Sequence, residues 1–266
     1  MLIDAHCHLN HEQFKLDLDK VIEASKKAGV KRIVCSGVNS VSNREVLELR
    51  KKYPDIVRAT AGIYPIDALG LGEDEGFPRQ IVSINLDEEF EFIKQNKQNF
   101  VGVGEVGLDY HWVKDKQTEM KANFEKIISF VEKINLPIVI HSRKAEEDCI
   151  NMLSSSTIKK VQMHCFGGKK SLVKKGAELG YYFSIPANIV KAEHFKMIAK
   201  EVDINQLLTE TDAPWLSPTG ERNVPQNVIF AIREISKIKG MTEEETMNNI
   251  WKNYMEFFDD SNTERD

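Results

Sequence analysis

Two histidines stand two positions apart near the N-terminus, in the run Asp4-Ala5-His6-Cys7-His8. Side chains alternate between the two faces of a strand, so His6 and His8 point the same way if a strand continues through them. Imidazole is the side chain that most often binds transition metals, and two imidazoles on one face can share an ion. Alone, this spacing is weak evidence, because two partly exposed histidines in a turn show the same pattern.

Four further residues of metal-binding type each follow a short apolar run: Glu105, His141, His164 and Asp212. In barrels of parallel strands, catalytic residues gather at the C-terminal ends of the strands. Chance could place one or two such residues there, but not six at five strand ends. The pattern therefore predicts a metal centre.

The number of candidate ligands predicts two divalent ions, because one open catalytic zinc typically has three protein ligands. Glu105 is central in strand order and is the candidate to bridge the ions. Two ions about 3.5–4 Å apart lower the pKa of a water molecule and neutralise charge on a leaving oxygen, which is the chemistry of hydrolysis. Asp212 is the candidate general base. The histidines favour zinc or manganese, whereas phosphate substrates favour magnesium.

Motifs of other chemistries are absent: the sequence has no GxxxxGK[ST] loop, no GxGxxG that opens a helix and no GxSxG elbow. The run Gly102-Val103-Gly104 precedes an acid and belongs to a predicted strand. Cys165 is next to His164, but neighbouring strand residues face opposite sides, so we expect a buried structural thiol.

The elements that must position these residues read as βα units around a parallel sheet, since short apolar runs alternate with longer amphipathic segments. A length of 266 residues suits a single (β/α)₈ barrel domain over residues 1–258. The predicted strands are Leu2–Ala5, Arg32–Gly37, Val57–Ile63, Phe100–Glu105, Leu136–His141, Val161–His164, Tyr181–Ser184 and Gln206–Glu210.

Amphipathic spacing predicts the intervening helices. They are Asp17–Ala28, Lys116–Ile134, Arg143–Leu153, Lys169–Leu179, Ala192–Val202 and Pro225–Ile238. An extra C-terminal helix, Thr242–Phe258, begins with a capping-box pattern and should pack on the outside of the barrel or cover its bottom. Residues 64–85 form a long irregular stretch that is either a lid or a surface insertion, and residues 259–266 should be a frayed tail.

Composition is that of a soluble globular protein, with 41% hydrophobic and 29% charged residues. No apolar run is long enough to span a membrane and the N-terminus does not resemble a signal peptide, so a cytoplasmic location is expected. The four cysteines are far apart, which predicts free thiols. A net charge of −5 argues against binding of nucleic acid through a broad basic surface, but it does not exclude a nuclease.

Several motifs together resemble the TatD-type metal-dependent deoxyribonucleases of the amidohydrolase superfamily, over nearly the whole chain. They are the His6 and His8 run, Gly104-Glu105-Val106-Gly107-Leu108-Asp109-Tyr110, Pro137-Ile138-Val139-Ile140-His141-Ser142-Arg143, His164-Cys165-Phe166 and Glu210-Thr211-Asp212-Ala213-Pro214. The resemblance implies a (β/α)₈ fold and hydrolysis of DNA phosphodiesters with magnesium, manganese or zinc. It also implies that His6, His8, Glu105 and Asp212 serve one ion and that Glu105, His141 and His164 serve the other.

The sequence departs from the family pattern at two places. Gly62-Ile63-Tyr64-Pro65 has a tyrosine where the family usually has a histidine near the substrate, which bears on rate and substrate choice. Gly167-Gly168 replaces a small hydroxyl residue followed by glycine, and one hydrogen bond to substrate is lost.

Candidate substrate contacts come from residues that follow the strands. Arg143, Arg222 and Lys169 could meet phosphate oxygens, or be solvated surface charges. Tyr64, Tyr110, Phe166 and Trp215 could stack on bases, or pack beneath loops. Asp109 and Glu210 could orient the metal ligands.

The leading hypothesis is an exonuclease on single-stranded DNA, because a narrow barrel mouth admits one strand more readily than a duplex. The alternatives are a hydrolase of an amide, lactone or aminoacyl ester, and a non-catalytic binding protein, against which the full ligand set argues. No protein partner or membrane contact is indicated.

Overall fold

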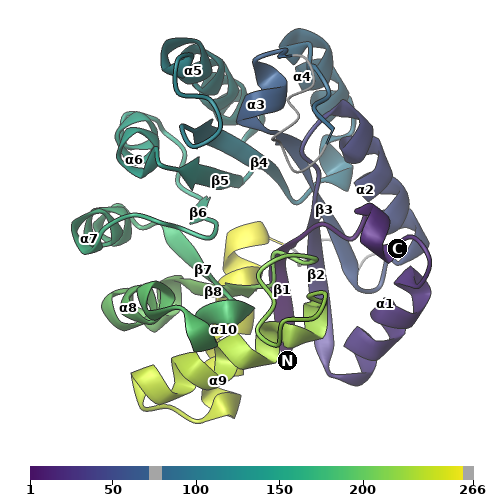
Figure 1. Ribbon diagram of the computed structural model, residues 1–266, viewed down its shortest axis with the longest axis vertical. Coiled ribbons are helices and arrows are strands. Elements are labelled where there is room, and N and C mark those ends of the chain that lie inside the picture. Colours follow the sequence, from purple (N-terminus) through teal and green to yellow (C-terminus); the bar gives the residue numbers. More distant parts are fainter. Residues whose placement is uncertain (72–79, 260–266) are drawn as a thin grey trace.

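Eight parallel strands form a ring with helices around its outside, as Figure 1 shows for the computed structural model, which describes residues 1–71 and 80–259. Each strand pairs with the next in chain order. The strands are β1 (Leu2–Cys7), β2 (Val30–Ser36), β3 (Val57–Ile63), β4 (Gly102–Asp109), β5 (Ile138–Arg143), β6 (Val161–Met163), β7 (Tyr182–Pro186) and β8 (Leu207–Glu210). The (β/α)₈ barrel predicted from the sequence is confirmed.

Helices follow the strands along the chain and, apart from the last one, form the outer layer. They are α1 (Leu18–Lys27), α2 (Ser40–Lys52), α3 (Pro65–Ala68), α4 (Leu86–Gln95), α5 (Gln117–Ile134), α6 (Glu146–Ser154), α7 (Lys170–Glu178), α8 (Glu193–Glu201), α9 (Val228–Lys239) and α10 (Glu243–Phe258). The predicted helices α6 and α9 begin three residues later than the sequence suggested. The helices α2, α3 and α4 were not predicted.

Strands β4 and β5 extend beyond their predicted ends. In their ladder Gly107 pairs with His141 and Asp109 with Arg143, so Glu105 and His141 lie inside strands and not at their last positions. In β4 the apolar residues Val106 and Leu108 continue the pattern beyond Glu105, whereas β5 ends in polar residues while the backbone pairing continues. The ladder is irregular at Glu105, since Val103 pairs with Ile138 and Val106 with Ile140, so a bulge as well as the pleat orients this side chain.

The seam between β1 and β8 is joined largely by hydrogen bonds of side chains and of the segment after β8. The Thr209 hydroxyl donates to the carbonyl oxygen of Ile3 at 2.8 Å, and the carboxylate of Asp4 accepts from the backbone N–H and the hydroxyl of Thr211. Beyond the strand, the Asp212 N–H donates to the carbonyl of His6 at 2.9 Å. These bonds fix Asp212 beside the histidines of β1.

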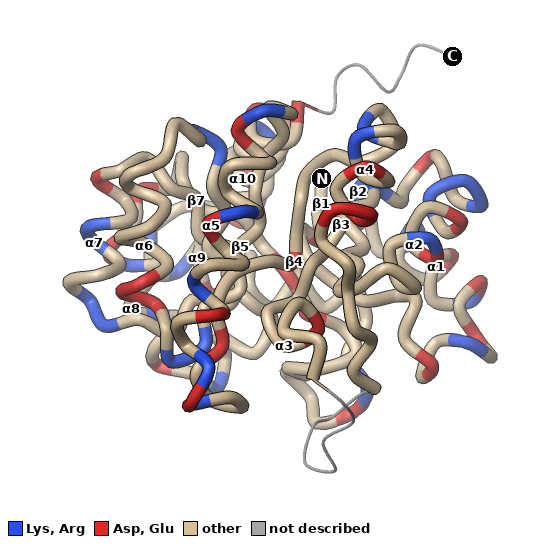
Figure 2. The backbone as a smooth tube through the Cα atoms, turned by 90° about the horizontal axis from the view of Figure 1, so that it is seen from above, with Lys and Arg blue, Asp and Glu red and all other residues tan. Residues whose placement is uncertain are grey.

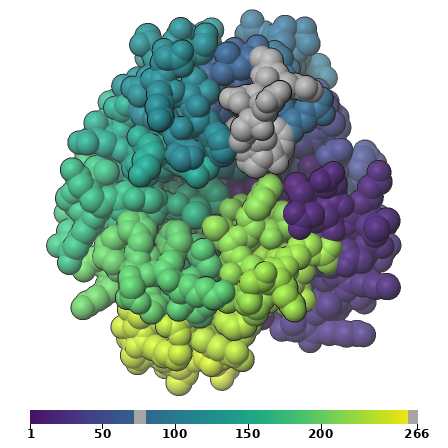
Figure 3. Space-filling model, in the orientation of Figure 1, coloured from purple at the N-terminus to yellow at the C-terminus, as the bar shows by residue number. Residues whose placement is uncertain are grey.

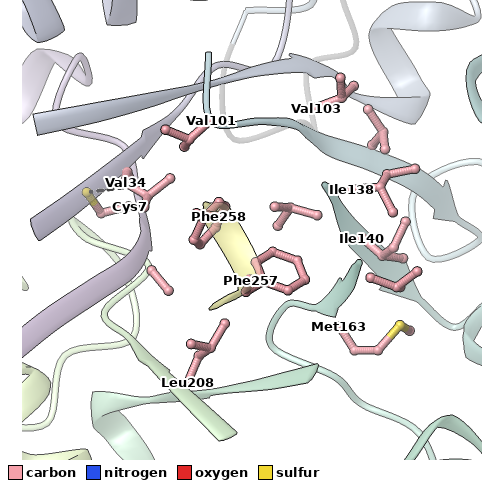
Figure 4. Close-up of a cluster of buried hydrophobic side chains, with 14 of the residues drawn as sticks. Cys7, Val34, Val101, Val103, Ile138, Ile140, Met163, Leu208, Phe257 and Phe258 are labelled. Carbon is pink, nitrogen blue, oxygen red and sulfur yellow. Dashed lines mark hydrogen bonds between the residues drawn. The ribbon is translucent and has the colours of Figure 1, made fainter. Parts of the chain in front are cut away.

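Helix α10 covers the bottom of the barrel, the second of the two placements predicted for it. Phe257 and Phe258 are buried and point into the ring of strands, among Val101, Ile138 and Leu208 (Figure 4). In the side view of Figure 2, α10 lies at one end of the molecule and α3 at the other. The predicted capping box is present, since Thr242 and Glu245 bond reciprocally at the start of the helix.

Within residues 1–71 and 80–259, no helix is long and apolar enough to cross a membrane. The predicted irregular stretch 64–85 contains the short helix α3, and its residues 72–79 lie outside the described residues. The predicted tail lies outside them too, apart from Asp259.

Candidate metal centre

The six residues predicted as ligands meet at the C-terminal end of the barrel. His6 and His8 lie with their Nε2 atoms 3.2 Å apart. Oε2 of Glu105 is 3.6 Å from Nε2 of His6 and 3.5 Å from Nε2 of His8, and Oδ1 of Asp212 is 3.4 Å from the latter. Side chains from β1, β4 and the segment after β8 thus converge on one point.

The other carboxylate oxygen of Glu105 faces a second group. Its Oε1 lies 2.7 Å from Nδ1 of His141 and 4.0 Å from Nε2 of His164. Each oxygen of one carboxylate therefore faces its own pair of imidazoles, the arrangement that a bridging ligand requires. Three overlapping sets of donors within 4.8 Å of one another could hold metal ions. They are His6, His8 and Glu105; Glu105, His141 and His164; and His6, His164 and Asp212.

Carboxylates hold the outer nitrogens of two of these histidines. Oδ2 of Asp109 lies 3.1 Å from Nε2 of His141, and Oε2 of Glu210 lies 2.8 Å from Nδ1 of His164. Such contacts fix ring orientation and increase ligand basicity. Asp109 and Glu210 are thus placed where the sequence analysis expected partners of the ligands.

The electrostatics keep the two candidate carboxylate ligands ionised. Burial opposes the charged form of Glu105, but hydrogen bonds from His141 and His6 hold its pKa well below the ordinary value. Burial also opposes the charged form of Asp212, but a hydrogen bond from His8 lowers its pKa. Burial opposes the charged forms of His141 and His164 as well, yet their carboxylate partners raise the pKa of His141 to about 9 and that of His164 to about 10. Glu105 and Asp212 are thus charged at neutral pH, as cation binding requires.

Local backbone geometry brings the strands close enough for these contacts. A Cβ atom on Gly62 would lie 1.8 Å from the carbonyl oxygen of Gly37 and 2.8 Å from the amide nitrogen of Glu105, so only glycine fits there. Asp212 has a φ of 55°, in the left-handed region that aspartate tolerates better than most residues. This conformation accompanies the placement of its carboxylate beside His8.

A cavity of about 540 Å³ opens above the ligands. Figure 3 shows the molecule hollowed near the centre of this face. Trp215, which is 36% exposed, contacts the rings of His8 and His11 edge-on, with centroids 5.3 and 5.1 Å away. The guanidinium of Arg143 lies 5.5 Å from the ring centre of Trp112. Aromatic and cationic groups therefore line the entrance.

Three of the seven candidate substrate contacts line this cavity, namely Tyr64, Arg143 and Trp215, whereas Lys169 is not among its lining residues. The Tyr64 hydroxyl donates to Oδ2 of Asp109 at 2.9 Å and lies 3.2 Å from Nε2 of His141. It therefore contacts both the candidate ligand His141 and its partner Asp109, a role that the sequence did not indicate.

Tyr110 and Arg222 are not among the residues lining the cavity. The Tyr110 hydroxyl donates to Asp148 at 2.8 Å, and Arg222 makes two hydrogen bonds to the carboxylate of Asp17, at 2.9 and 2.6 Å, above the ring of Phe14. Each polar head is thus bound by an acidic side chain outside the cavity. The sequence gives proximity to a strand end but not the direction of a long side chain.

Of two further predictions, the packing alternative for Phe166 is confirmed and the buried thiol at Cys165 is wrong. Phe166 is buried against Phe183, which is the packing alternative considered for it. Cys165 is only partly buried and lines the cavity, because it lies in a turn with φ of 41° after β6 and not within the strand. The four cysteines are free thiols, as predicted.

The cavity also includes Gly167, which the sequence placed near the substrate, and residues that sequence reasoning missed: Asn10, His11, Val38, Trp112, Ser142, Glu146 and Leu216. Trp112 carried a usable signal, since it follows the Gly-Leu-Asp-Tyr motif by two positions. Ser142 lies in β5 and Glu146 begins α6, and the remaining four belong to connecting segments whose path the sequence pattern does not specify.

A ring of histidines and carboxylates at the carboxyl ends of barrel strands defines a metal-dependent hydrolase. Residues 3–259 match the model of the TatD related DNase family, and the chain belongs to this family.

Named relatives agree with this membership. The chain is 34% identical to a Bacillus subtilis protein described as an uncharacterized metal-dependent hydrolase, YabD, over 97% of this chain and 99% of that one. It is 31% identical to the human deoxyribonuclease TATDN3, over 97% and 94%. The crystal structure of YJJV, a TatD homologue from Escherichia coli, superposes with a TM-score of 0.85 at 21% identity, over 97% and 98%, and supports the fold.

Proposed function

We propose that this hydrolase cleaves DNA phosphodiester bonds with two divalent ions. One ion would be held by His6, His8 and Asp212, the other by His141 and His164, and Glu105 would bridge them. The observation that carries the assignment is the position of Glu105, whose two oxygens each face a separate pair of imidazoles. When bound, such ions lower the pKa of a water molecule and neutralise charge on a leaving oxygen.

The chain's own groups have the remaining tasks. The carboxylate of Asp212 is 17% exposed, lines the cavity and can accept the proton of the attacking water as general base. Arg143 presents a guanidinium that suits phosphate oxygens. Trp112 and Trp215 line the cavity and offer rings on which a base can stack.

The cavity favours the end of a single strand. Its volume of about 540 Å³ is in the range of pockets for small molecules, about 300–1,000 Å³, and accommodates a terminal nucleotide but not a duplex. We therefore propose exonucleolytic cleavage. The nitrogen-rich ligand set favours zinc or manganese, and phosphate substrates favour magnesium.

The test is degradation of end-labelled single-stranded DNA by metal-stripped protein that is re-supplied with magnesium, manganese or zinc. We expect stepwise shortening that requires one of these ions and is lost in Asp212→Asn. The matched control is Asp203→Asn, which alters an exposed aspartate in the turn before β8 and should keep full activity. Absence of shortening with all three ions would refute DNA as substrate.

A carbonyl substrate is the second candidate. Among the residues that the structure describes, Arg143 is the only lysine or arginine that lines the cavity, and Glu146 lies there as well. A single cation binds a polyanion weakly, which favours a smaller substrate such as an amide, lactone or aminoacyl ester. Turnover of such esters by the same metal-loaded protein, with DNA left intact, would select this alternative.

A further inference from the structure

The carboxyl end of β2 supplies no candidate ligand, yet it contacts three of them. The hydroxyl of Ser36 lies 3.1 Å from Nδ1 of His6, and the backbone carbonyl of Ser36 lies 3.0 Å from Nδ1 of His8. The next carbonyl, that of Gly37, accepts a hydrogen bond from the N–H of Glu105 at 3.2 Å. Two consecutive residues thus touch ligands from both β1 and β4.

The contact to His8 determines which of its two ring nitrogens carries the lone pair. A carbonyl oxygen only accepts hydrogen bonds, so Nδ1 of His8 must carry the hydrogen. The lone pair of neutral His8 is then on Nε2, the atom that faces Glu105 and Asp212. A backbone group of β2 therefore presents His8 in the tautomer that can bind an ion.

The contact to His6 depends on a pair of hydroxyl groups. Ser36 and Thr60 are register partners on β2 and β3, and their hydroxyl oxygens are 2.8 Å apart. Both side chains are completely buried. When Nδ1 of His6 donates to Ser36, the Ser36 hydroxyl can donate onward to Thr60, and Nε2 of His6 keeps its lone pair.

We propose that Ser36, supported by Thr60, is the positioning residue for His6 and His8. The inference rests on the two-ion site of the proposed function and adds to it a part played by β2. Ser36 orients the two imidazoles in different ways, through its side chain for His6 and through its backbone for His8. Its hydroxyl should therefore matter to the ion on the His6 side and not to the ion at His141 and His164.

The experiment measures the affinity of metal-stripped protein for Zn²⁺ and for Mn²⁺, by competition with a chelator, in wild type, Ser36→Ala and Ser184→Ala. Ser184 is a matched control, because it is a buried barrel serine whose hydroxyl bonds Gln162 and no candidate ligand. We expect Ser36→Ala to weaken one of two binding steps by about 10–100-fold, the usual effect of losing an outer partner of a metal ligand, and Ser184→Ala to weaken neither.

A second pair of variants separates the hydroxyl from the shape of the side chain. Thr60→Val should weaken the same metal-binding step. Thr60→Ser, which keeps the hydroxyl, should retain most of the wild-type affinity for metal. Thr246→Val removes a buried threonine hydroxyl that bonds the carbonyl of Thr242 within α10 and serves as the control. Thermal unfolding of the metal-free variants detects any general loss of stability.

Equal metal affinities in Ser36→Ala and Ser184→Ala would overturn the proposal. Equal losses of metal affinity in Thr60→Val and Thr60→Ser would overturn it as well. These results leave the proposed function intact if the wild type binds two ions and degrades DNA. If the wild type binds only one ion, the two-ion function fails, and the Ser36→Ala affinity for that single ion still decides whether Ser36 positions its ligands.

Discussion

At the scale of single residues, the site depends as much on the partners of the ligands as on the ligands. Asp109 and Glu210 contact the outer nitrogens of His141 and His164, while Ser36 contacts both histidines of β1. Tyr64 belongs with these partners, because its hydroxyl donates to Asp109 beside His141. We therefore expect the tyrosine at this position to affect the orientation of His141, a proposed ligand.

We predict that Tyr64→Phe lowers kcat and leaves KM nearly unchanged. Losing one hydrogen bond costs about 0.5–1.5 kcal/mol, which is a few-fold to roughly tenfold in rate. Steady-state kinetics on single-stranded DNA measure both constants. A higher KM with unchanged kcat would instead show that the hydroxyl binds substrate, as the sequence suggested, and a variant unable to bind metal would show that the ring itself is needed.

At the scale of elements, the two ends of the barrel have separate tasks. The candidate ligands lie at the C-terminal ends of the strands, and α10 fills the opposite end with Phe257 and Phe258. Asn253 ties the same helix to the start of β8, since its side-chain N–H groups donate to the carbonyls of Ile204 and Leu207. Helix α10 should therefore contribute to stability and not to chemistry.

We predict that Phe257→Ala destabilises the protein by about 3–5 kcal/mol, because the truncation leaves a cavity among packed side chains. Phe257→Leu should cost less, since the cavity is smaller. Lys252→Ala, on the exposed face of α10, should change stability by less than about 0.5 kcal/mol. Urea unfolding measures the stability of all three variants. Their affinity for zinc, measured below the unfolding transition, should equal that of the wild type. An unaltered midpoint in Phe257→Ala would contradict the role of α10.

At the scale of the whole molecule, a net charge of −5 coexists with a buried cluster of carboxylates and imidazoles. The ions that this cluster is proposed to hold would bind the folded chain and not the unfolded one. Metal should therefore be part of the stability of the protein.

We predict that removing metal lowers the Tm. A ligand present at about 100 times its Kd stabilises the fold by about 2.7 kcal/mol, which corresponds to roughly 5–10 °C at about 2–4 °C per kcal/mol. Calorimetry of metal-stripped and zinc-reloaded protein measures the difference in Tm. In Asp212→Asn, zinc should raise the Tm by less than in the wild type. The same Tm with and without zinc would argue against ions as ligands of the native state.

The fold class and the six candidate ligands follow from the amino-acid sequence, because strand periodicity and short polar motifs are local properties. His6, His8, Glu105, His141 and His164 each lie in or directly after an apolar run. The pleat alone does not give the directions of His6 and Glu105, since the strand register is irregular at both positions. The partners of the candidate ligands depend on tertiary structure, since strand register places Ser36 against His6 and Thr60 against Ser36. Tertiary structure also places Arg143 at the cavity beside Trp112 and Arg222 against Asp17, because the direction of a long flexible side chain depends on partners from other elements.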